Sequence, residues 1–175
     1  IRLIGTMTDI SELKNREMQR YYQATHDELT GLLNRRGFME AIAMRFTDRQ
    51  PVTGAFLVVD FDGFRFINDV HGQEVGDEFL QAFARHLKDS FPQDTVLARF
   101  GADEYLAFFP ELMDAAAAIN LFQPLAVVLL QTSAGSFAAR SSGGFFLCGG
   151  QEGTPESYLQ KAVLAMHHAK IVEKS

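Results

Sequence analysis

The segment at residues 99–105, with the sequence Arg-Phe-Gly-Ala-Asp-Glu-Tyr, holds two neighbouring carboxylates, Asp103 and Glu104. Short apolar runs at residues 96–98 and 105–109 flank its Gly-Ala step, which is the pattern of a β-hairpin with a tight turn between its strands. Such a turn leaves side chains and backbone amides open to a ligand. Two acids beside a glycine therefore indicate a site that holds a cation and a phosphate group.

A second group of polar residues begins with Asp60, directly after the continuous apolar run at residues 54–59. The run is typical of a strand that is buried on both faces, and a carboxylate at the C-terminal end of such a strand is a favoured ligand position in α/β sheets. The alternative is that Asp60 only forms a turn or caps a helix. Residues 60–69 contain three acids, one amide and one guanidinium, and polar groups at this density exclude a core segment.

Asn68 and Asp77 together offer a carbonyl, an amide and a carboxylate, which is the complement of a guanine edge. The carboxylate can accept from the ring N–H and the exocyclic amine, while the amide pairs beside it. Asp77 has a second interpretation, because the sequence also predicts a helix that starts at Gly76 and runs to about Phe91. Asp77 would then be the N-cap of that helix.

The composition is that of one globular domain with an N-terminal appendage: 175 residues, of which 47% are apolar and 22% are charged. The net charge is -6, with 22 acidic against 16 basic residues, which excludes general nucleic-acid binding but allows a nucleotide bound through metal. A single cysteine, Cys148, excludes an internal disulfide and indicates a reducing compartment. We therefore expect this domain to lie in the cytoplasm. This expectation includes the case in which the parent protein is attached to a membrane. The first residue is not Met, so we expect a fragment of a longer chain.

Hydrophobic spacing, capping residues and prolines predict the elements that position these motifs. The expected elements are helices at residues 10–24, 35–46 and 76–91, a helix from Asp114 that breaks at Pro124, short strands at residues 137–139 and 145–147, and a helix from Pro155 with Thr154 as its cap. The apolar positions of the first helix are sparse. This helix either pairs with a second copy or is a solvated linker.

Lys170 and Lys174 lie four residues apart on one face of the last predicted helix, near its C-terminal end. Cations at this end of a helix are favoured by the helix dipole alone. Without further context, both lysines are therefore best explained as surface charges.

Five motifs occur in the order and spacing of GGDEF domains, the diguanylate cyclases, and the chain resembles this family over about residues 25–175. The motifs are His-Asp-Glu-Leu-Thr-Gly-Leu-Leu-Asn-Arg at residues 26–35, Asp-Phe-Asp-Gly-Phe-Arg-Phe-Ile-Asn-Asp at 60–69, Gly-Asp at 76–77, the segment at 99–105, and Ala-Met-His-His-Ala-Lys at 165–170. Residues 5–12 also resemble the tail of a PAS sensor domain and the signalling helix that commonly follows it. The resemblance implies a PAS-tail remnant and signalling helix linker at residues 1–25, a GGDEF domain at residues 26–175, and an upstream PAS-type sensor.

The resemblance implies an α/β (α+β) fold, in which helices flank a central, mostly antiparallel sheet as in nucleotide cyclases, preceded by an N-terminal helix. It also implies condensation of two GTP molecules into cyclic di-GMP with release of two pyrophosphates. Each domain would bind one GTP, so turnover requires a homodimer. Two Mg²⁺ or Mn²⁺ ions are implied in each active site.

The resemblance also assigns roles by motif position. Asp60, the backbone carbonyl of Phe61, Asp103 and Glu104 would bind the metal ions, and Asp103 and Glu104 would be the catalytic residues. Glu104 resembles the residue near the attacking 3′-hydroxyl, as base or as second metal contact. Asn68 and Asp77 match the guanine-reading pair, and the other implied substrate-binding residues are Phe64, Arg65, Gly101, Ala102, Lys170 and Lys174.

Ala102 stands at the second glycine of the family signature, and Tyr105 at its terminal Phe. If the turn demands a positive φ, the Cβ of Ala102 costs about 1–2 kcal/mol and slows the enzyme. Three function classes follow: a working diguanylate cyclase, a degenerate domain that binds GTP without turnover and regulates an attached module, and a purely structural dimerisation or docking unit. The first is favoured, because every metal, guanine and catalytic position keeps a competent side chain.

Overall fold

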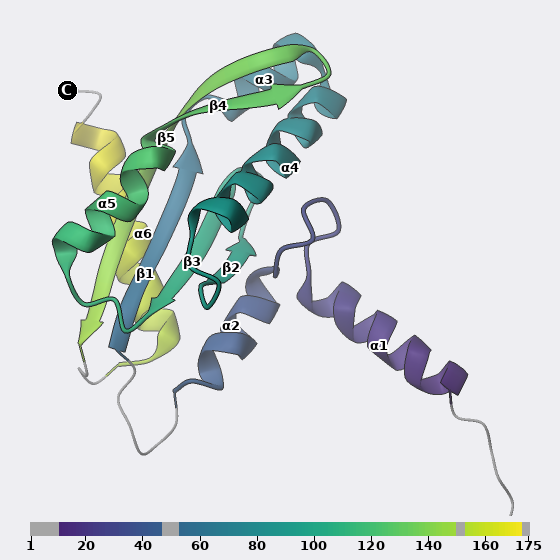
Figure 1. The fold of residues 1–175 in the computed structure, drawn as a ribbon, viewed down its shortest axis with the longest axis vertical. Helices are drawn as coiled ribbons and strands as arrows, with labels where there is room; N and C mark the ends of the chain where they lie inside the picture. Colours follow the sequence, from purple (N-terminus) through teal and green to yellow (C-terminus); the bar gives the residue numbers. More distant parts are fainter. Residues whose placement is uncertain (1–10, 47–52, 150–152, 173–175) are drawn as a thin grey trace, which may run out of the picture.

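The computed structural model describes residues 11–46, 53–149 and 153–172. In this part of the chain five strands form one antiparallel sheet in the order β2-β3-β1-β5-β4, with helices on both faces (Figure 1). The predicted α+β architecture is therefore confirmed. None of the described helices is both long and apolar enough to cross a membrane. The elements in chain order are α1 (Ser11–Thr25), α2 (Arg35–Ala43), β1 (Thr53–Phe61), α3 (Phe64–His71), α4 (Gln73–Ser90), β2 (Val96–Arg99), β3 (Glu104–Pro110), α5 (Ala115–Ala126), β4 (Val127–Thr132), β5 (Gly135–Gly149) and α6 (Pro155–Val172).

The central strand β1 carries the apolar run that predicts a buried strand. Residues 54–59 are all buried, and β1 pairs along its length with β3 on one side and β5 on the other. The predicted hairpin is also confirmed, because β2 and β3 pair antiparallel with Arg99 opposite Tyr105. Residues 100–103 form the connection between the two strands, and they carry the Gly-Ala step and the first of the two acids.

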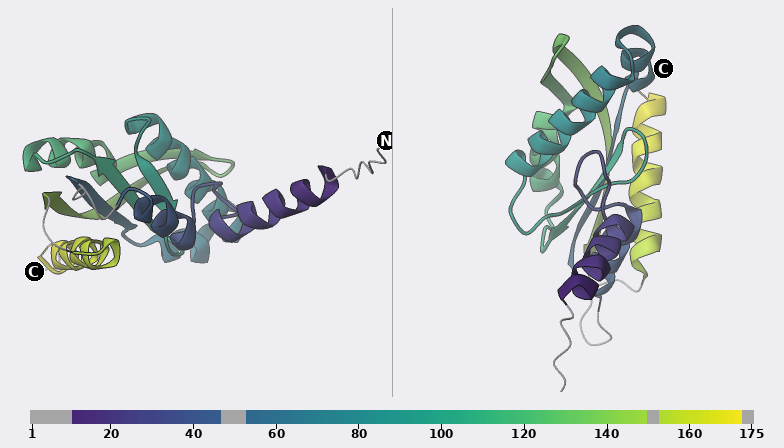
Figure 2. Two further views of the ribbon diagram at one scale, coloured as in Figure 1. Left: turned by 90° about the horizontal axis from the view of Figure 1, so that it is seen from below. Right: turned by 90° about the vertical axis from the view of Figure 1, so that its right-hand side faces the viewer.

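Successive residues of β1 face two separate hydrophobic cores, as expected for a strand with helices on both sides. Leu57 and Phe61 face the core formed with α4 and α5, where the ring centroid of Phe61 lies 4.3 Å from that of Phe83. Phe56 and Val58 face the core formed with α2 and α6. Figure 2 shows α6 on one side of the sheet and α4 with α5 on the other. Even-numbered residues of β1 therefore point toward α6.

One long strand, β5, replaces the two short strands predicted at residues 137–139 and 145–147. The Gly143-Gly144 pair is not a turn but a point of close approach on both faces of the sheet. A Cβ at Gly143 would lie 2.4 Å from the Phe122 ring of α5, and a Cβ at Gly144 would lie 2.2 Å from the backbone nitrogen of Met166 in α6. The absent side chains let one helix pack closely on each side.

Helix α4 begins at Gln73, three residues before the predicted start, and helix α3 precedes it over Phe64–His71. A single residue, Gly72, joins the two helices with a φ of 86°. Asp77 therefore lies inside α4 and is not its N-cap, so that interpretation is wrong. Gly76 is buried within the same helix, where it permits close contact with α3.

The predicted break at Pro124 is wrong as well, because α5 continues through Pro124 to Ala126. Pro124 lies in the last turn, so its missing N–H removes only one bond at the end of the helix. Leu125, the next residue, is fully buried in the core, and this burial offsets the cost of the proline. The chain then passes directly into β4.

Helix α1 confirms the predicted N-terminal helix and projects away from the sheet (Figures 1 and 2). Among the side chains of α1 that the structure describes, the exposed large apolar ones are Met18 (64%), Tyr21 (56%) and Tyr22 (52%). The segment that resembles a PAS tail, residues 5–12, lies almost entirely outside the described residues.

Candidate functional site

The predicted acids gather at one end of the sheet, on the side of α6. Asp60 in β1 is the direct neighbour of Glu104 in β3, so both side chains point to the same face. Asp60 lies two residues after Val58 and four after Phe56 in β1, so its side chain points to the same face as theirs. It therefore points away from the core that contains α4. Asp103 is the last residue of the β2–β3 connection, directly before Glu104. The three carboxylates thus come from the adjacent strands β1 and β3 and from the turn that joins β2 to β3.

Tyr105 anchors this end of β3 in the opposite core. Its side chain is only 1% exposed, and its hydroxyl donates a hydrogen bond of 2.9 Å to the Leu80 carbonyl in α4. The ring also packs edge-on against Phe83, at 4.9 Å between centroids. A tyrosine therefore fits where the family signature has Phe, because its hydroxyl has a partner.

Helix α6 brings a cation to the acids. The ammonium of Lys170 bonds to a carboxylate oxygen of Asp60, and it lies 3.8 Å from a carboxylate oxygen of Asp62. Ser142 in β5, which faces Asp60 across the strands, donates its hydroxyl to Asp62 at 3.2 Å. Lys170 is therefore not a free surface charge but part of the cluster. Lys174 lies outside the described residues.

The electrostatics of the cluster reflect its crowded negative charge. Burial raises the pKa of Asp103 above its usual value, and the charge of Asp60 raises it further. The pKa of Glu104 is also raised, by burial first and then by the charges of Asp60 and Asp103. Lys170 opposes these shifts without cancelling them. Such a cluster favours the binding of a proton or a further cation.

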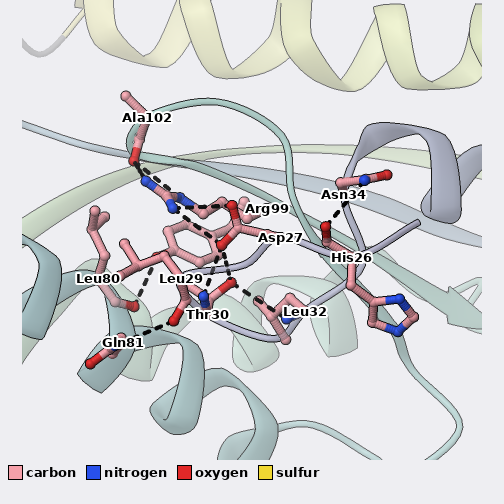
Figure 3. A network of polar contacts seen from close by, with 11 residues as sticks. His26, Asp27, Leu29, Thr30, Leu32, Asn34, Leu80, Gln81, Arg99 and Ala102 are labelled. Atoms are coloured by element: carbon pink, nitrogen blue, oxygen red, sulfur yellow. Dashed lines mark hydrogen bonds and ion pairs between the residues drawn. The ribbon is translucent and has the colours of Figure 1, made fainter. Parts of the chain in front are cut away.

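The turn that carries Asp103 is held by Arg99 and Asp27 (Figure 3). The Arg99 guanidinium donates to the Ala102 carbonyl at 2.7 Å, and on its other side to both carboxylate oxygens of Asp27 at 3.2 Å. Asp27 also accepts from the Thr30 hydroxyl at 2.6 Å and from its backbone N–H at 2.9 Å. Burial alone would raise the pKa of Asp27, but these bonds from Thr30 and Arg99 outweigh it and lower the pKa.

Ala102 is not strained, contrary to the expectation from its place in the signature. In the described residues, Glu111 is the only residue other than glycine with a positive φ, so Ala102 needs no left-handed conformation. The turn instead closes through two N–H groups, of Phe100 and Gly101, which both donate to the Glu104 carbonyl at 2.8 and 3.4 Å. Gly101 lies tightly against the acid, since a Cβ there would be 3.1 Å from the Glu104 carboxylate.

The two residues predicted to read guanine lie on α3 and α4, where these helices are in close contact. A Cβ on Gly76 would lie 1.8 Å from the side-chain oxygen of Asn68, so Asn68 packs against the residue that precedes Asp77. That oxygen is buried and has no hydrogen-bond partner among the described residues. Asp77 is half-buried one position further along α4. The fold therefore places the two residues on packed neighbouring helices, and their joint reading of guanine stays a prediction.

Two further predicted substrate-binding residues lie in the first turn of α3. The Phe64 side chain is 6% exposed and packs against Phe79, so its backbone is the part left to meet a ligand. Arg65 is exposed, and its Nε lies 3.7 Å from a carboxylate oxygen of Asp69, one turn along the helix. The N-cap of α3 is Gly63, which offers no side-chain cap for the free N–H groups of the first turn.

The donor set suits a hard divalent cation in its chemistry, because carboxylate oxygens are the ligands that Mg²⁺ and Mn²⁺ prefer. The raised pKa values of Asp103 and Glu104 are consistent with a place for positive charge. As the described side chains stand, however, no three His, Cys, Asp or Glu residues are arranged to hold a metal ion. A cation bound by Asp60 therefore competes with the Lys170 ammonium.

Sequence reasoning did not assign roles to Asp27, Arg99, Asp62 or Ser142. The ion pair between Asp27 and Arg99 joins residues 72 positions apart, and the contact of Ser142 with Asp62 spans 80 positions. No local pattern predicts such contacts. One signal was present, since an Asp three residues before a Thr is typical of a side-chain-stabilised turn.

Comparison with known proteins identifies the family. The family model described as "Diguanylate cyclase, GGDEF domain" matches residues 24–174. Diguanylate cyclase DgcM of Escherichia coli is 36% identical over 104 residues, which are 58% of this chain and 25% of DgcM. The chain thus spans a quarter of the length of this curated relative, and a smaller share of several others.

Solved structures agree in fold. A sensory box/GGDEF family protein of Caulobacter crescentus superimposes with a TM-score of 0.71 at 30% identity, over 85% of this chain and 99% of that one. The coiled coil and GGDEF domain of Caulobacter crescentus DgcB, solved in complex with c-di-GMP, gives a TM-score of 0.78 at 23% identity, over 93% of this chain and 89% of that one. Sequence motifs, sheet topology and site geometry thus lead to one assignment: the chain belongs to the diguanylate cyclase GGDEF domain family.

Proposed function

We propose that the domain condenses two GTP molecules into cyclic di-GMP and two pyrophosphates. The observation that carries this proposal is the convergence of Asp60, Asp103, Glu104 and Lys170 at one end of the sheet. Three acids suit the divalent cations that accompany a nucleoside triphosphate and the handling of a hydroxyl proton, and the ammonium suits the phosphate oxygens. A purely structural unit would leave this crowded, destabilising cluster without a role.

The chemical roles follow from the charges of the site. Glu104, with its raised pKa, accepts the proton of the 3′-hydroxyl that attacks the α-phosphate. Lys170 exchanges its carboxylate partners for the triphosphate and stabilises the charge of the leaving pyrophosphate. Backbone N–H groups at the start of α3 contribute to binding the phosphates. Two divalent ions bound by Asp60, the Phe61 carbonyl and Asp103 would polarise the phosphoryl oxygens and lower the pKa of the hydroxyl.

Guanine is read by Asn68 and Asp77. The Asn68 amide is suited to pair with the edge of the base beside Asp77. Asp77 accepts from the ring N–H and the exocyclic amine, groups that adenine does not present in the same arrangement.

Asp77→Ala is therefore expected to weaken GTP binding by roughly 10- to 100-fold, the value of a charge-assisted hydrogen bond, and ATP binding far less. Calorimetric titration with both nucleotides measures the two affinities. Asp89→Ala, an exposed acid of the same helix, is the matched control and should change neither. Equal losses for GTP and ATP would exclude base recognition by Asp77.

Turnover takes place between two copies, because the 3′-hydroxyl of one GTP attacks the α-phosphate of the other. Each site holds one nucleotide, so two sites must face each other. The exposed Met18 and Tyr22 on α1, four residues apart on one face, support pairing of these helices as one route to the dimer.

Ala102→Gly should have little effect, because Ala102 has no positive φ and no strain to relieve. We expect the rate of cyclic di-GMP formation to stay within about threefold of the parent, which corresponds to about 0.7 kcal/mol. The thermal midpoint should be equal or slightly lower, since glycine adds freedom to the unfolded chain. Initial rates and melting curves test this. A rate increase of tenfold or more would mean that the methyl group hinders the nucleotide.

Incubation with GTP and Mg²⁺ or Mn²⁺, followed by chromatography, separates the three function classes when GTP affinity is measured alongside. Cyclic di-GMP supports the cyclase. Tight GTP binding without product supports the degenerate domain that regulates an attached module. Absence of both product and binding would leave only a structural dimerisation or docking unit.

A further inference from the structure

We propose that the outward face of the β4–β5 ribbon, formed by Val127, Leu129, Ala138 and Arg140, is the surface that meets the second copy of this chain during catalysis. The proposal rests on the proposed function, because it is the condensation of two GTP molecules that requires two sites to face each other. It adds a specific contact surface outside the cluster of acids.

The ribbon face is continuous with the acidic site. Ser142 points toward the site, where its hydroxyl bonds to Asp62, whereas Ser141 points to the other side and bonds to the Leu125 carbonyl in α5. Side chains alternate along a strand, so Arg140 and Ala138 point the same way as Ser142. At about 3.3 Å per residue, Ala138 lies roughly 13 Å beyond Ser142 along the strand.

The edge strand β4 adds apolar side chains to the same face. Val127 is paired with Arg140, and Leu129 with Ala138. Val127 is 61% exposed and Leu129 is 66% exposed, while Val128, between them, is 3% exposed in the core. An edge strand with exposed apolar residues is unfavourable in water unless another surface covers it.

Arg140 gives the face a positive charge next to the phosphate region. Its carbonyl accepts from the Asp62 N–H at 3.0 Å, which fixes Arg140 beside the turn that leads into α3. Its side chain is exposed and forms no ion pair with any residue that the structure describes. A guanidinium is suited to phosphate oxygens and carboxylates, both of which face it when an acidic, GTP-bound second copy approaches.

The geometry of the reaction selects the second copy as the occupant. The 3′-hydroxyl of one GTP can reach the α-phosphate of the other, and displace its pyrophosphate, only if the surfaces around the acids of both copies lie against each other. The ribbon face borders the acids directly and combines apolar residues with a cation, as protein interfaces do. Helix α6 covers β5 near Gly144 but leaves the ribbon beyond Arg140 exposed.

The test places an acid or a cysteine on this face. Leu129→Asp should raise the protein concentration for half-maximal specific activity by about tenfold or more, which is 1.4 kcal/mol of association, with GTP affinity and thermal midpoint unchanged. Arg140→Glu should also raise the protein concentration for half-maximal specific activity. Ile119 on α5, across the sheet, is equally exposed at 64%, so Ile119→Asp is the matched control. It should leave the dependence of specific activity on protein concentration unchanged.

Cross-linking tests the surface without requiring turnover. With GTP and Mg²⁺, Leu129→Cys should give covalent dimers with a short bis-maleimide, whereas Ile119→Cys should not, and the native Cys148 is fully buried. If the parent forms no product, the proposed function fails, but the cross-linking result still decides the surface. Activity curves of Leu129→Asp that match the parent, or no cross-link at Leu129→Cys, would overturn the proposal. A loss of GTP affinity or thermal stability in Leu129→Asp would do so too, because the face would then serve its own nucleotide or another part of the chain.

Discussion

Asp103→Asn is expected to reduce cyclic di-GMP formation by about a thousandfold or more, because a charge that the reaction needs is worth several kcal/mol in the transition state. The change removes one of three crowded carboxylates and keeps the size of the side chain. Burial and the charge of Asp60 both disfavour the ionised form of Asp103 in the folded protein. The variant should therefore fold as well as the parent or better. Unchanged activity would contradict the role of Asp103 as metal ligand.

The pH dependence of stability gives an independent check on this variant. Burial and the charge of Asp60 raise the pKa of Asp103 in the folded protein above the ordinary value of an aspartate, so the folded state binds the proton more tightly than the unfolded state. The parent thus gains stability as the pH falls through the raised pKa toward about 4, and loses it as the pH rises. Melting curves from pH 4 to 8 should show the advantage of Asp103→Asn largest at neutral pH and smallest near pH 4. Asp94→Asn, an exposed acid, serves as control.

Arg99→Ala is expected to impair both stability and turnover. The Arg99 side chain is 13% exposed and that of Asp27 is 23% exposed, so the loss of the guanidinium leaves a partly buried carboxylate without its ion pair. We expect a decrease of about 1–3 kcal/mol in the free energy of unfolding. The Ala102 carbonyl also loses its donor, and a shift of about 1 Å in the turn that carries Asp103 would cost roughly a hundredfold in rate.

A double-mutant cycle with Asp27→Asn separates the two effects of Arg99. Denaturant unfolding should show coupling between the two changes, because their side chains bond to each other. The rate loss should be larger for Arg99→Ala than for Asp27→Asn, since only Arg99 contacts the turn. Arg36→Ala breaks an exposed ion pair with Glu40 and should change neither quantity. Equal rates for the Arg99 variant and the parent would show that the turn needs no anchor.

Local signals predicted the elements that carry the acids. The run at residues 54–59 is apolar throughout because the strand is buried on both faces, and that pattern predicts β1 directly. The Thr154 cap with Pro155 in the first turn correctly marks the start of α6. Asp60 accordingly lies near the C-terminal end of β1, and Asp103 and Glu104 lie at the hairpin turn and the start of β3, while their chemical roles stay predictions.

Other features depend on contacts that a sequence does not display. The sequence predicted two short strands at residues 137–139 and 145–147, yet Gly143 and Gly144 lie inside one continuous strand, because helices approach both faces of β5. Gly76 likewise marks close packing of α4 on α3 and not the start of a helix. The backbone conformation of Ala102 is set by the hydrogen bonds of the turn and by Arg99, so the identity of one residue did not predict strain.

The most direct test of the proposed function is the specific rate of cyclic di-GMP formation from GTP and Mg²⁺ or Mn²⁺, measured by chromatography over a wide range of protein concentrations. We expect product, and a rate per mole of protein that rises with concentration to a plateau, because two GTP-bound sites must meet. Absence of product at every concentration, while GTP binds with normal affinity, would contradict the assignment of this chain as a working cyclase.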